Sequence, residues 1–157
     1  MRHDRLDKLE DVFEFSRNKK CILQLKQFLV GKKLLKLQIS QGEQFLRFIT
    51  EDGGSLLLIA EGDCCSESWF ADVCGIDSLI GSVITDVQIK NLPDPIDART
   101  RQASDSAYGI FLITETGMCD IVFRNSSNGY YCGWCSVTAE SACFGLKFRD
   151  ITEDFSA

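Results

Sequence analysis

Histidine and long apolar runs are scarce in this sequence, and both shortages bear on function. The single histidine, His3, lies near the N-terminus, where chain ends fray, so a cysteine–histidine catalytic pair is not expected. No apolar run approaches the roughly 20 residues that span a bilayer, and the charged first residues lack a signal-peptide core. No glycine-rich loop of the phosphate-binding kind is present. We therefore expect a cytoplasmic protein without a membrane segment.

The sequence also lacks an excess of basic residues. It holds 17 Lys and Arg residues against 23 Asp and Glu residues, which gives a net charge of −6. General nucleic-acid binders need clustered Lys and Arg to displace counterions from phosphates, so nucleic acid is not an expected partner. The one basic cluster, Lys32, Lys33 and Lys36, is interpreted as a solvated polar face.

Cysteine, by contrast, is abundant, with eight residues in 157. In a chain without an export signal these are expected to be mostly reduced thiols. A free cysteine behaves as a small buried hydrophobe when its neighbours are apolar. This pattern predicts core positions for Cys21, Cys74, Cys119 and Cys143.

Apolar residues spaced three or four apart predict helices in the first 30 residues. Residues 4–17 carry such a stripe behind a possible N-cap, Asp4, and residues 21–30 carry another that Gly31 ends. A short helix is also expected from Ser66 to Gly75, followed by one further turn at residues 77–80.

From residue 33 the pattern alternates, which predicts strands at residues 35–39, 45–49 and 55–60. Residues 29–39 can be laid on residues 79–89, and residues 48–53 on residues 112–117. The second pair of segments lies further apart in the sequence than the first pair. Residues 91–104, which contain both prolines, are interpreted as an inserted loop that explains this difference. We infer two related antiparallel meanders, in one sheet or in two packed sheets.

Two similar turns follow the third strand of each meander. Asp-Cys-Cys at residues 63–65 precedes two aromatic residues, and Asn-Gly-Tyr-Tyr-Cys-Gly-Trp-Cys occupies residues 128–135. Tyr and Trp beside Asn and Ser are typical of contact surfaces. The expected binding surface comprises Asp63, Ser66, Glu67, Trp69, Asn128, Tyr130, Tyr131 and Trp134. The alternative is that the aromatic residues close the end of the core.

The cysteines of these turns suggest a structural zinc site, because four thiolates suit Zn²⁺ and Cys-x-x-Cys is a familiar ligand spacing. Against it, adjacent residues of a strand point to opposite faces. A redox role for the Cys-x-x-Cys pair is weakened because no helix is predicted after it. Asp63 and Glu67 can serve as an acid–base pair, but turn and capping roles are preferred. The zinc ligands would be Cys64, Cys65, Cys132 and Cys135.

Three blocks in order give the chain a family resemblance: Asp-Cys-Cys at 63–65, Leu-Ile-Gly-Ser at 79–82, and Ser-Asn-Gly-Tyr-Tyr at 127–131. The sequence resembles an uncharacterised domain family of bacteria and their phages over residues 29–137. The resemblance implies a small standalone α/β domain and brings no known activity. The chain departs from the pattern in its longer N-terminal region and in Cys132 and Cys135, so a zinc site using them would be particular to it.

Taken together, the sequence predicts a single α+β domain over residues 1–157 that acts mainly by binding. It comprises a helical region at 1–30, a first meander at 31–75, and a second meander at 76–157 with the loop 91–104. The expected partner is a host or phage protein, bound by an accessory or inhibitor-like domain without catalysis or cofactor. The alternatives are a zinc-stabilised domain or a thiol-dependent enzyme. A homodimer through an open sheet edge is a further possibility.

Overall fold

The computed structural model describes residues 18–63, 65–95, 102, 104–127 and 133–151, together with the backbone of residues 155–156. The helix expected at residues 4–17 lies outside these residues. In the described part, residues 18–29 are helical, and Gly31 follows with φ +86°, the left-handed conformation that ends many helices. The buried face of this helix comprises Cys21, Ile22, Leu25 and Leu29.

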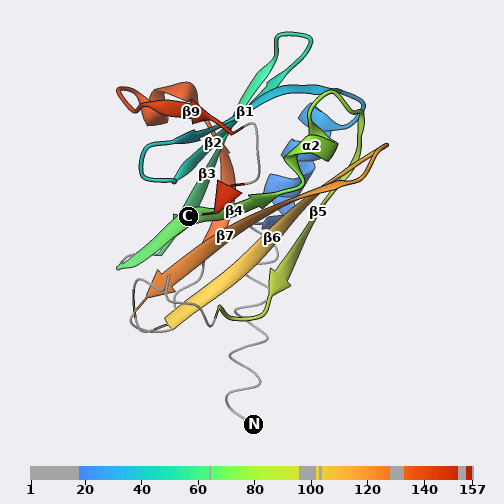
Figure 1. Ribbon diagram of the computed structural model, residues 1–157. Coiled ribbons are helices and arrows are strands. Elements are labelled where there is room, and N and C mark those ends of the chain that lie inside the picture. The colour runs from blue at the N-terminus through green and yellow to red at the C-terminus, as the bar shows by residue number, and fades with distance from the viewer. Residues whose placement is uncertain are drawn as a thin grey trace.

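Two antiparallel sheets form most of the structure (Figure 1). The first sheet has the order β8-β3-β2-β1-β9 and the second has the order β10-β4-β7-β6-β5. The strands of the first sheet are β1 (Leu34–Ser40), β2 (Phe45–Thr50), β3 (Ser55–Gly62), β8 (Gly133–Thr138) and β9 (Phe148–Asp150). Those of the second are β4 (Ser66–Cys74), β5 (Ile84–Leu92), β6 (Ser104–Thr114), β7 (Met118–Ser127) and β10 (Phe155–Ser156). Of the two arrangements expected from the sequence, one sheet or two packed sheets, the structure has two sheets.

One core joins the helix and both sheets. Alternate residues of the longer strands point inward, and the buried cluster includes Leu46 and Phe48 from the first sheet and Ile110 and Leu112 from the second. The helix of residues 18–29 contributes Leu25 and its other apolar residues to the same cluster. No helix in the described part of the chain is both long and apolar enough to cross a membrane.

Strands β1–β4 form one half of the fold and strands β5–β8 form the other, and the fourth strand of each half pairs with the third strand of the other half. Thus β4 lies beside β7, and β8 lies beside β3. The halves also meet at their entry points, where the Gly31 amide donates to the Ile84 carbonyl at 2.8 Å and the Gly81 amide donates to the Leu34 carbonyl at 3.0 Å. The pairing register shifts by one residue near the start of each first strand, between Leu34 and Lys36 in β1 and between Ile84 and Asp86 in β5.

Two local predictions are wrong. The helix expected from Ser66 to Gly75 is the strand β4, because its backbone groups pair with β7 from Ser66↔Ser127 to Cys74↔Asp120. The helical turn that follows is real, as α2 (Ile76–Leu79). Cys21, Cys119 and Cys143 are buried as predicted, but Cys74 is exposed, because Val73 beside it takes the inward position of β4.

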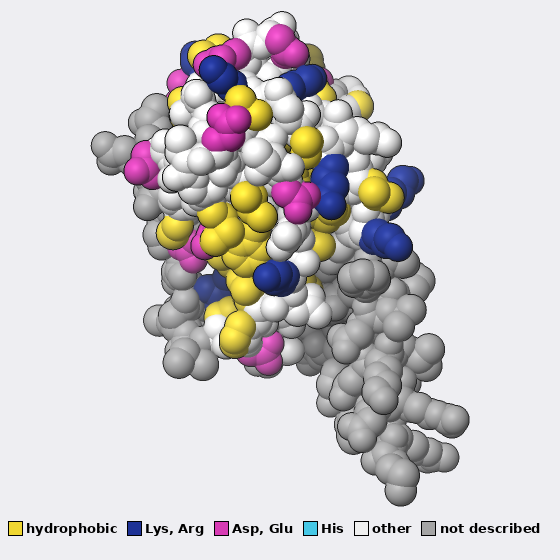
Figure 2. All heavy atoms as spheres, turned by 90° about the vertical axis from the view of Figure 1, so that its right-hand side faces the viewer, with side chains coloured by type: hydrophobic (Ala, Val, Ile, Leu, Met, Phe, Trp, Pro, Cys, Tyr) yellow, Lys and Arg dark blue, Asp and Glu magenta, His cyan; other side chains and the backbone are white. Residues whose placement is uncertain are grey.

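A partly apolar face covers the outside of the second sheet. Figure 2 shows hydrophobic side chains gathered on the side where β5 lies, with charged side chains of both signs around them. Successive residues of a strand point to opposite faces. Because Ile110 and Leu112 of β6 are fully buried in the core, Phe111 and Ile113 point outward. The Lys90 ammonium lies 5.6 Å from the centre of the Phe111 ring, so a cation covers part of this face.

Candidate functional site

A polar groove of about 400 Å³ lies where β3 ends and β4 begins. The turn between these two strands contains Asp63 and Cys65 of the Asp-Cys-Cys block. The residues that line the groove are Gly42, Gln44, Ala60, Glu61, Gly62, Ser66, Glu67 and Ser68. The charged side chains in this lining are both carboxylates, Glu61 and Glu67, so the groove is suited to cationic groups.

Two glycines let the backbone close around a buried asparagine at the base of the groove. Gly62 and Gly133 face each other across β3 and β8. A Cβ atom on Gly62 would lie 2.4 Å from the Ser66 Oγ and 2.5 Å from the Asn125 Nδ2. A Cβ atom on Gly133 would lie 2.6 Å from the Asn125 Cβ. Both positions therefore require glycine for close packing and not for a turn.

Asn125 ties the two sides of the turn together. Its Nδ2 donates to the Ser66 Oγ at 3.1 Å and to the Ser68 Oγ at 2.9 Å. Each serine in turn donates to a backbone carbonyl, Ser66 to Asp63 at 2.6 Å and Ser68 to Glu61 at 2.8 Å. Because Asn125 is only 2% exposed, this network holds the groove wall in one geometry.

Glu61 joins the groove to the tryptophan of the second turn. Its Oε2 accepts hydrogen bonds from the Trp134 Nε1 at 3.1 Å and from the Ser136 Oγ at 2.8 Å. The two backbones are paired here, with Glu61 opposite Trp134. The pairing of β3 with β8 therefore brings the end of the strand before the first turn beside the strand that follows the second turn. Trp134 is half-buried, with its polar edge directed to Glu61.

A buried ion pair lies next to this network on β6 and β7. The Arg124 Nε donates to the Asp105 Oδ1 at 3.2 Å, and its Nη2 donates to Oδ2 at 3.0 Å. The side chains are 2% and 4% exposed, so the pair is almost fully removed from water. The guanidinium also lies 5.4 Å from the ring of Trp69.

This packing corrects one residue of the expected binding surface. Trp69 is 2% exposed and belongs to the interior, whereas the expected surface required its ring in solvent. The physical reason is the pairing of β4 with β7, which sets Trp69 opposite Arg124. The burial of Trp69 agrees with the alternative interpretation, in which the aromatic residues close the end of the core.

The other expected site residues divide into two groups. The structure places Ser66 and Glu67 in the groove lining and Asp63 in the turn beside it. Glu61, Ser68 and Asn125 were missed, although Asn125 lies in the Asn-Ser-Ser run just before the second turn. Five of the proposed residues lie outside the described part of the chain: Cys64, Asn128, Tyr130, Tyr131 and Cys132.

The described cysteines of the proposed zinc set occupy different environments. Cys65 is exposed, with φ +70° at the turn, whereas Cys135 is fully buried in β8. Burial raises the pKa of the Cys135 thiol well above its usual value, and Cys21 and Glu61 nearby raise it further. Within the residues described, no group of three or more His, Cys, Asp and Glu side chains is arranged to hold a metal ion. The zinc site stays a prediction.

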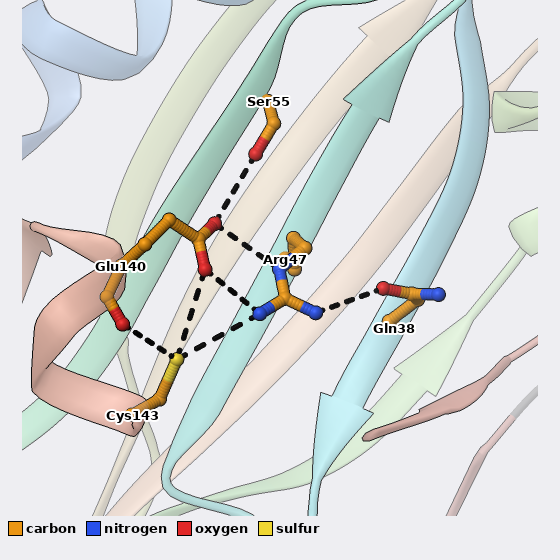
Figure 3. Close-up of polar contacts among 5 residues, drawn as sticks. All are labelled: Gln38, Arg47, Ser55, Glu140 and Cys143. Carbon is orange, nitrogen blue, oxygen red and sulfur yellow. Dashed lines mark hydrogen bonds and ion pairs between the residues drawn. The ribbon is translucent and has the colours of Figure 1, made fainter. Parts of the chain in front are cut away.

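A second polar cluster fixes residues 139–148, here called the strap, which runs from β8 to β9 (Figure 3). The Arg47 Nε donates to the Glu140 Oε1 at 3.1 Å, and the Arg47 Nη2 donates to Oε2 at 2.8 Å. The Gln38 Oε1 accepts from the Arg47 Nη1 at 3.2 Å. The hydrogen bond from Arg47 lowers the pKa of Glu140. This forked pair anchors the start of the strap to the middle of the first sheet.

A small apolar cluster holds the rest of the strap. Cys143, Phe45 and Leu57 are buried together, with Phe148 packed against them, and the Arg47 guanidinium lies 3.9 Å from the Phe148 ring centre. Between these contacts the strap turns outward, and Phe144 is 94% exposed. The strap therefore presents a large aromatic side chain to solvent from a fixed base.

The fold and the groove define a two-sheet antiparallel β domain with an acidic, hydrogen-bonded groove at the crossing of its halves. A family model described as a domain of unknown function (DUF7448) matches residues 27–137, and the chain belongs to this family. The chain is also similar to "Uncharacterized protein L278" of Acanthamoeba polyphaga mimivirus, at 29% identity over 120 residues. That match covers 74% of this chain and 95% of the viral protein. No solved structure matches the chain significantly.

The comparisons agree with the expected resemblance to an uncharacterised domain family. They add a virus as the source of one relative. Occurrence in bacteria and phages, and the three sequence blocks as a family signature, stay predictions.

Proposed function

We propose that this protein is a cytoplasmic accessory domain that binds another protein through the groove, taking a basic segment of the partner. One observation carries the proposal: both charged side chains of the groove lining, Glu61 and Glu67, are carboxylates. A basic peptide segment would place Arg or Lys side chains beside them, with serine hydroxyls and the Gln44 amide as further hydrogen-bonding groups.

The construction of the groove supports binding without a large rearrangement. Asn125 and its two serine partners already hold the wall, so little ordering is required when a partner binds. Trp134 beside the groove has an apolar ring with its N–H held by Glu61, a combination that is enriched at protein interfaces. Asp63, at the adjoining turn, adds a further carboxylate to this surface.

The proposed setting is a virus, phage or mobile element, with a host protein as partner. The relative from a mimivirus supports a viral setting. The −6 net charge supports the choice of a basic partner segment, since complementary charge speeds association and suppresses wrong partners.

We further propose that the two halves are related copies about a pseudo-twofold axis. The reciprocal hydrogen bonds of Gly31 to Ile84 and of Gly81 to Leu34 support this relation. So does the isolated antiparallel bridge between Lys33 and Val83, which occupy equivalent positions of the two halves. The groove and the expected second turn would then be equivalent ends of one repeated unit.

The test is fluorescence polarisation with a labelled peptide of alternating Arg and Ser, titrated at low and at high salt. Binding is expected to weaken with salt, because exposed charges are screened. Glu67→Lys is expected to lower the affinity about tenfold or more, as a reversed rim charge does. The matched control is Glu51→Lys, which makes the same charge change in the exposed β2–β3 turn. Equal losses in both variants, or no binding to the unaltered protein, would refute the proposal.

The alternative function, a zinc-stabilised domain or a thiol-dependent enzyme, is favoured by one observation. Cys65 is exposed at the turn beside the groove and has a positive φ, which is uncommon for a residue other than glycine. The zinc content of protein purified under reducing conditions tests this function, with a count of titratable thiols beside it. About one zinc per chain would support a metal-stabilised domain. Absence of zinc would reject the metal-stabilised domain, and a Cys65 thiol no more reactive toward iodoacetamide than a cysteine of the unfolded chain would reject the thiol-dependent enzyme.

A further inference from the structure

We propose that two copies of this chain associate by placing Phe144 of each strap into an apolar pocket on the other copy. The features that carry this inference are an aromatic side chain presented to solvent, a pocket of matching size, and complementary charges next to each. None of them belongs to the groove.

Phe144 is presented by a rigid part of the molecule. Its side chain is 94% exposed, far more than that of any other large hydrophobic residue described. Gly145 follows with φ +83° and so sets the outward turn of the strap. The base is fixed by the Arg47–Glu140 ion pair at 2.8 Å and by the buried Cys143 (Figure 3). The backbone that carries Phe144 is therefore ordered before binding, which lowers the entropic cost of using this side chain as an anchor.

The pocket lies between β1, α2 and the end of β9. Its volume is about 240 Å³, below the roughly 300–1,000 Å³ of sites for drug-sized ligands, so it suits a single large side chain. Leu37 and Ile76 form a buried floor, each 1% exposed. Leu35 and Ile80 stand at the rim, 49% and 36% exposed. Covering these two aliphatic side chains would remove apolar surface from water.

One pair of opposite charges is placed to form between the two copies. The charged residues that line the pocket are Lys36, Asp77 and Asp150, and Lys36 lies 4.0 Å from Asp150. In the described part of the chain, Asp77 has no ion pair. Three residues after Phe144, the exposed Lys147 provides a cation on the strap. With Phe144 in the pocket of a second copy, Lys147 would be available to pair with Asp77.

The position of both features along β9 favours a closed dimer. Asp150 ends β9 and Ile151 follows it, and both line the pocket. Phe144 lies just before β9 along the chain. Thus β9, which forms the edge of the first sheet, connects the anchor to the pocket through a short length of chain. A twofold axis near β9 would then make both contacts at once, as an isologous interface requires.

Sedimentation velocity over a concentration series tests the inference, with the full chain throughout. The unaltered protein is expected to shift from monomer to dimer as concentration rises. Phe144→Ser is expected to weaken the dimer by at least about tenfold, as loss of a central anchor does. Leu23→Ser is the matched control, because Leu23 is also exposed, at 53%, but lies on the helix of residues 18–29. It should leave the dimer unchanged.

A charge exchange tests the orientation. Lys147→Asp and Asp77→Lys should each weaken the dimer, and the double variant should restore it, because the pair is rebuilt with reversed signs. Both residues are exposed, so the fold should tolerate the changes, which circular dichroism checks. A monomer at every concentration, equal behaviour of Phe144→Ser and Leu23→Ser, or a double variant no better than the single ones would overturn the proposal.

Discussion

The buried ion pair between Arg124 and Asp105 gives the sharpest test of how this fold is held together. Replacing Asp105 with alanine leaves a guanidinium that is 2% exposed without its carboxylate. At the observed 3.0 Å separation, two unit charges attract by about 5 kcal/mol for an effective dielectric constant near 20. Removing one partner of a buried pair generally costs about 3–5 kcal/mol, since the remaining charge stays out of water.

This loss should be visible as a large shift in urea unfolding. Domains of this kind are stable by about 5–15 kcal/mol. With a slope of about 2 kcal/mol per molar urea, a loss of 3–5 kcal/mol lowers the midpoint by about 1.5–2.5 M. Fluorescence is a suitable signal, because the Trp69 ring lies 5.4 Å from the guanidinium.

A double variant separates the cost of an unpaired charge from the value of the pair. Asp105→Leu with Arg124→Met replaces both groups by apolar side chains, and such replacements are often neutral. We therefore expect the double variant to be more stable than Asp105→Ala. A midpoint for Asp105→Ala within about 0.3 M of the unaltered protein, a change of under 1 kcal/mol, would refute the reasoning.

Three further predictions concern packing, thiols and pH. Gly62→Ala should destabilise the domain by about 1–3 kcal/mol in the same urea assay, because its Cβ would lie 2.5 Å from the Asn125 Nδ2; an unchanged midpoint would contradict this packing. In alkylation at pH 8 followed by mass spectrometry, Cys65 should react in the folded protein and Cys21 only after unfolding, because burial raises the pKa of Cys21 to about 12; early labelling of Cys21 would contradict it. Since its arginine partner lowers the pKa of Glu140, Glu140→Gln should cost about 0.5–1 kcal/mol at pH 7, a difference that shrinks as pH falls below about 4.3 and the wild-type carboxylate takes up a proton. A difference that is constant from pH 7 to pH 3 would contradict that account.

Much of the fold follows from local patterns. The alternation of β1 and β2 and the Gly-Gly turn before β3 predict the first three strands, and the structure has them. Gly31 ends a helix as expected, with the positive φ that glycine accepts easily. These features depend on neighbours in sequence, so the residues themselves carry the signal.

The segment of β4 shows where local patterns fail. Ser66, Trp69, Phe70 and Val73 fall at spacings that suit a short helix. In the structure the same residues pair with β7, at residues 48 to 61 positions further along the chain, and their backbone hydrogen bonds are made there. No local feature encodes that partner, so periodicity alone misassigned the segment.

The candidate site divides in the same way. The turn residues Asp63, Ser66 and Glu67 were identified because turn-forming and polar residues gather there. Glu61 and Asn125 were not, since each looks like an ordinary residue at the end of a strand. Only the pairing of β3 with β8 and of β4 with β7 brings them to the groove.

The sequence by itself determined the positions of the first three strands, the acidic charge and the place of the first turn, because these depend on composition and on near neighbours. The tertiary structure decided which thiols and aromatic rings are buried, where Arg124 finds its carboxylate, and that Phe144 stands in solvent. Those outcomes depend on contacts between distant strands, where burial and pairing outweigh local preference.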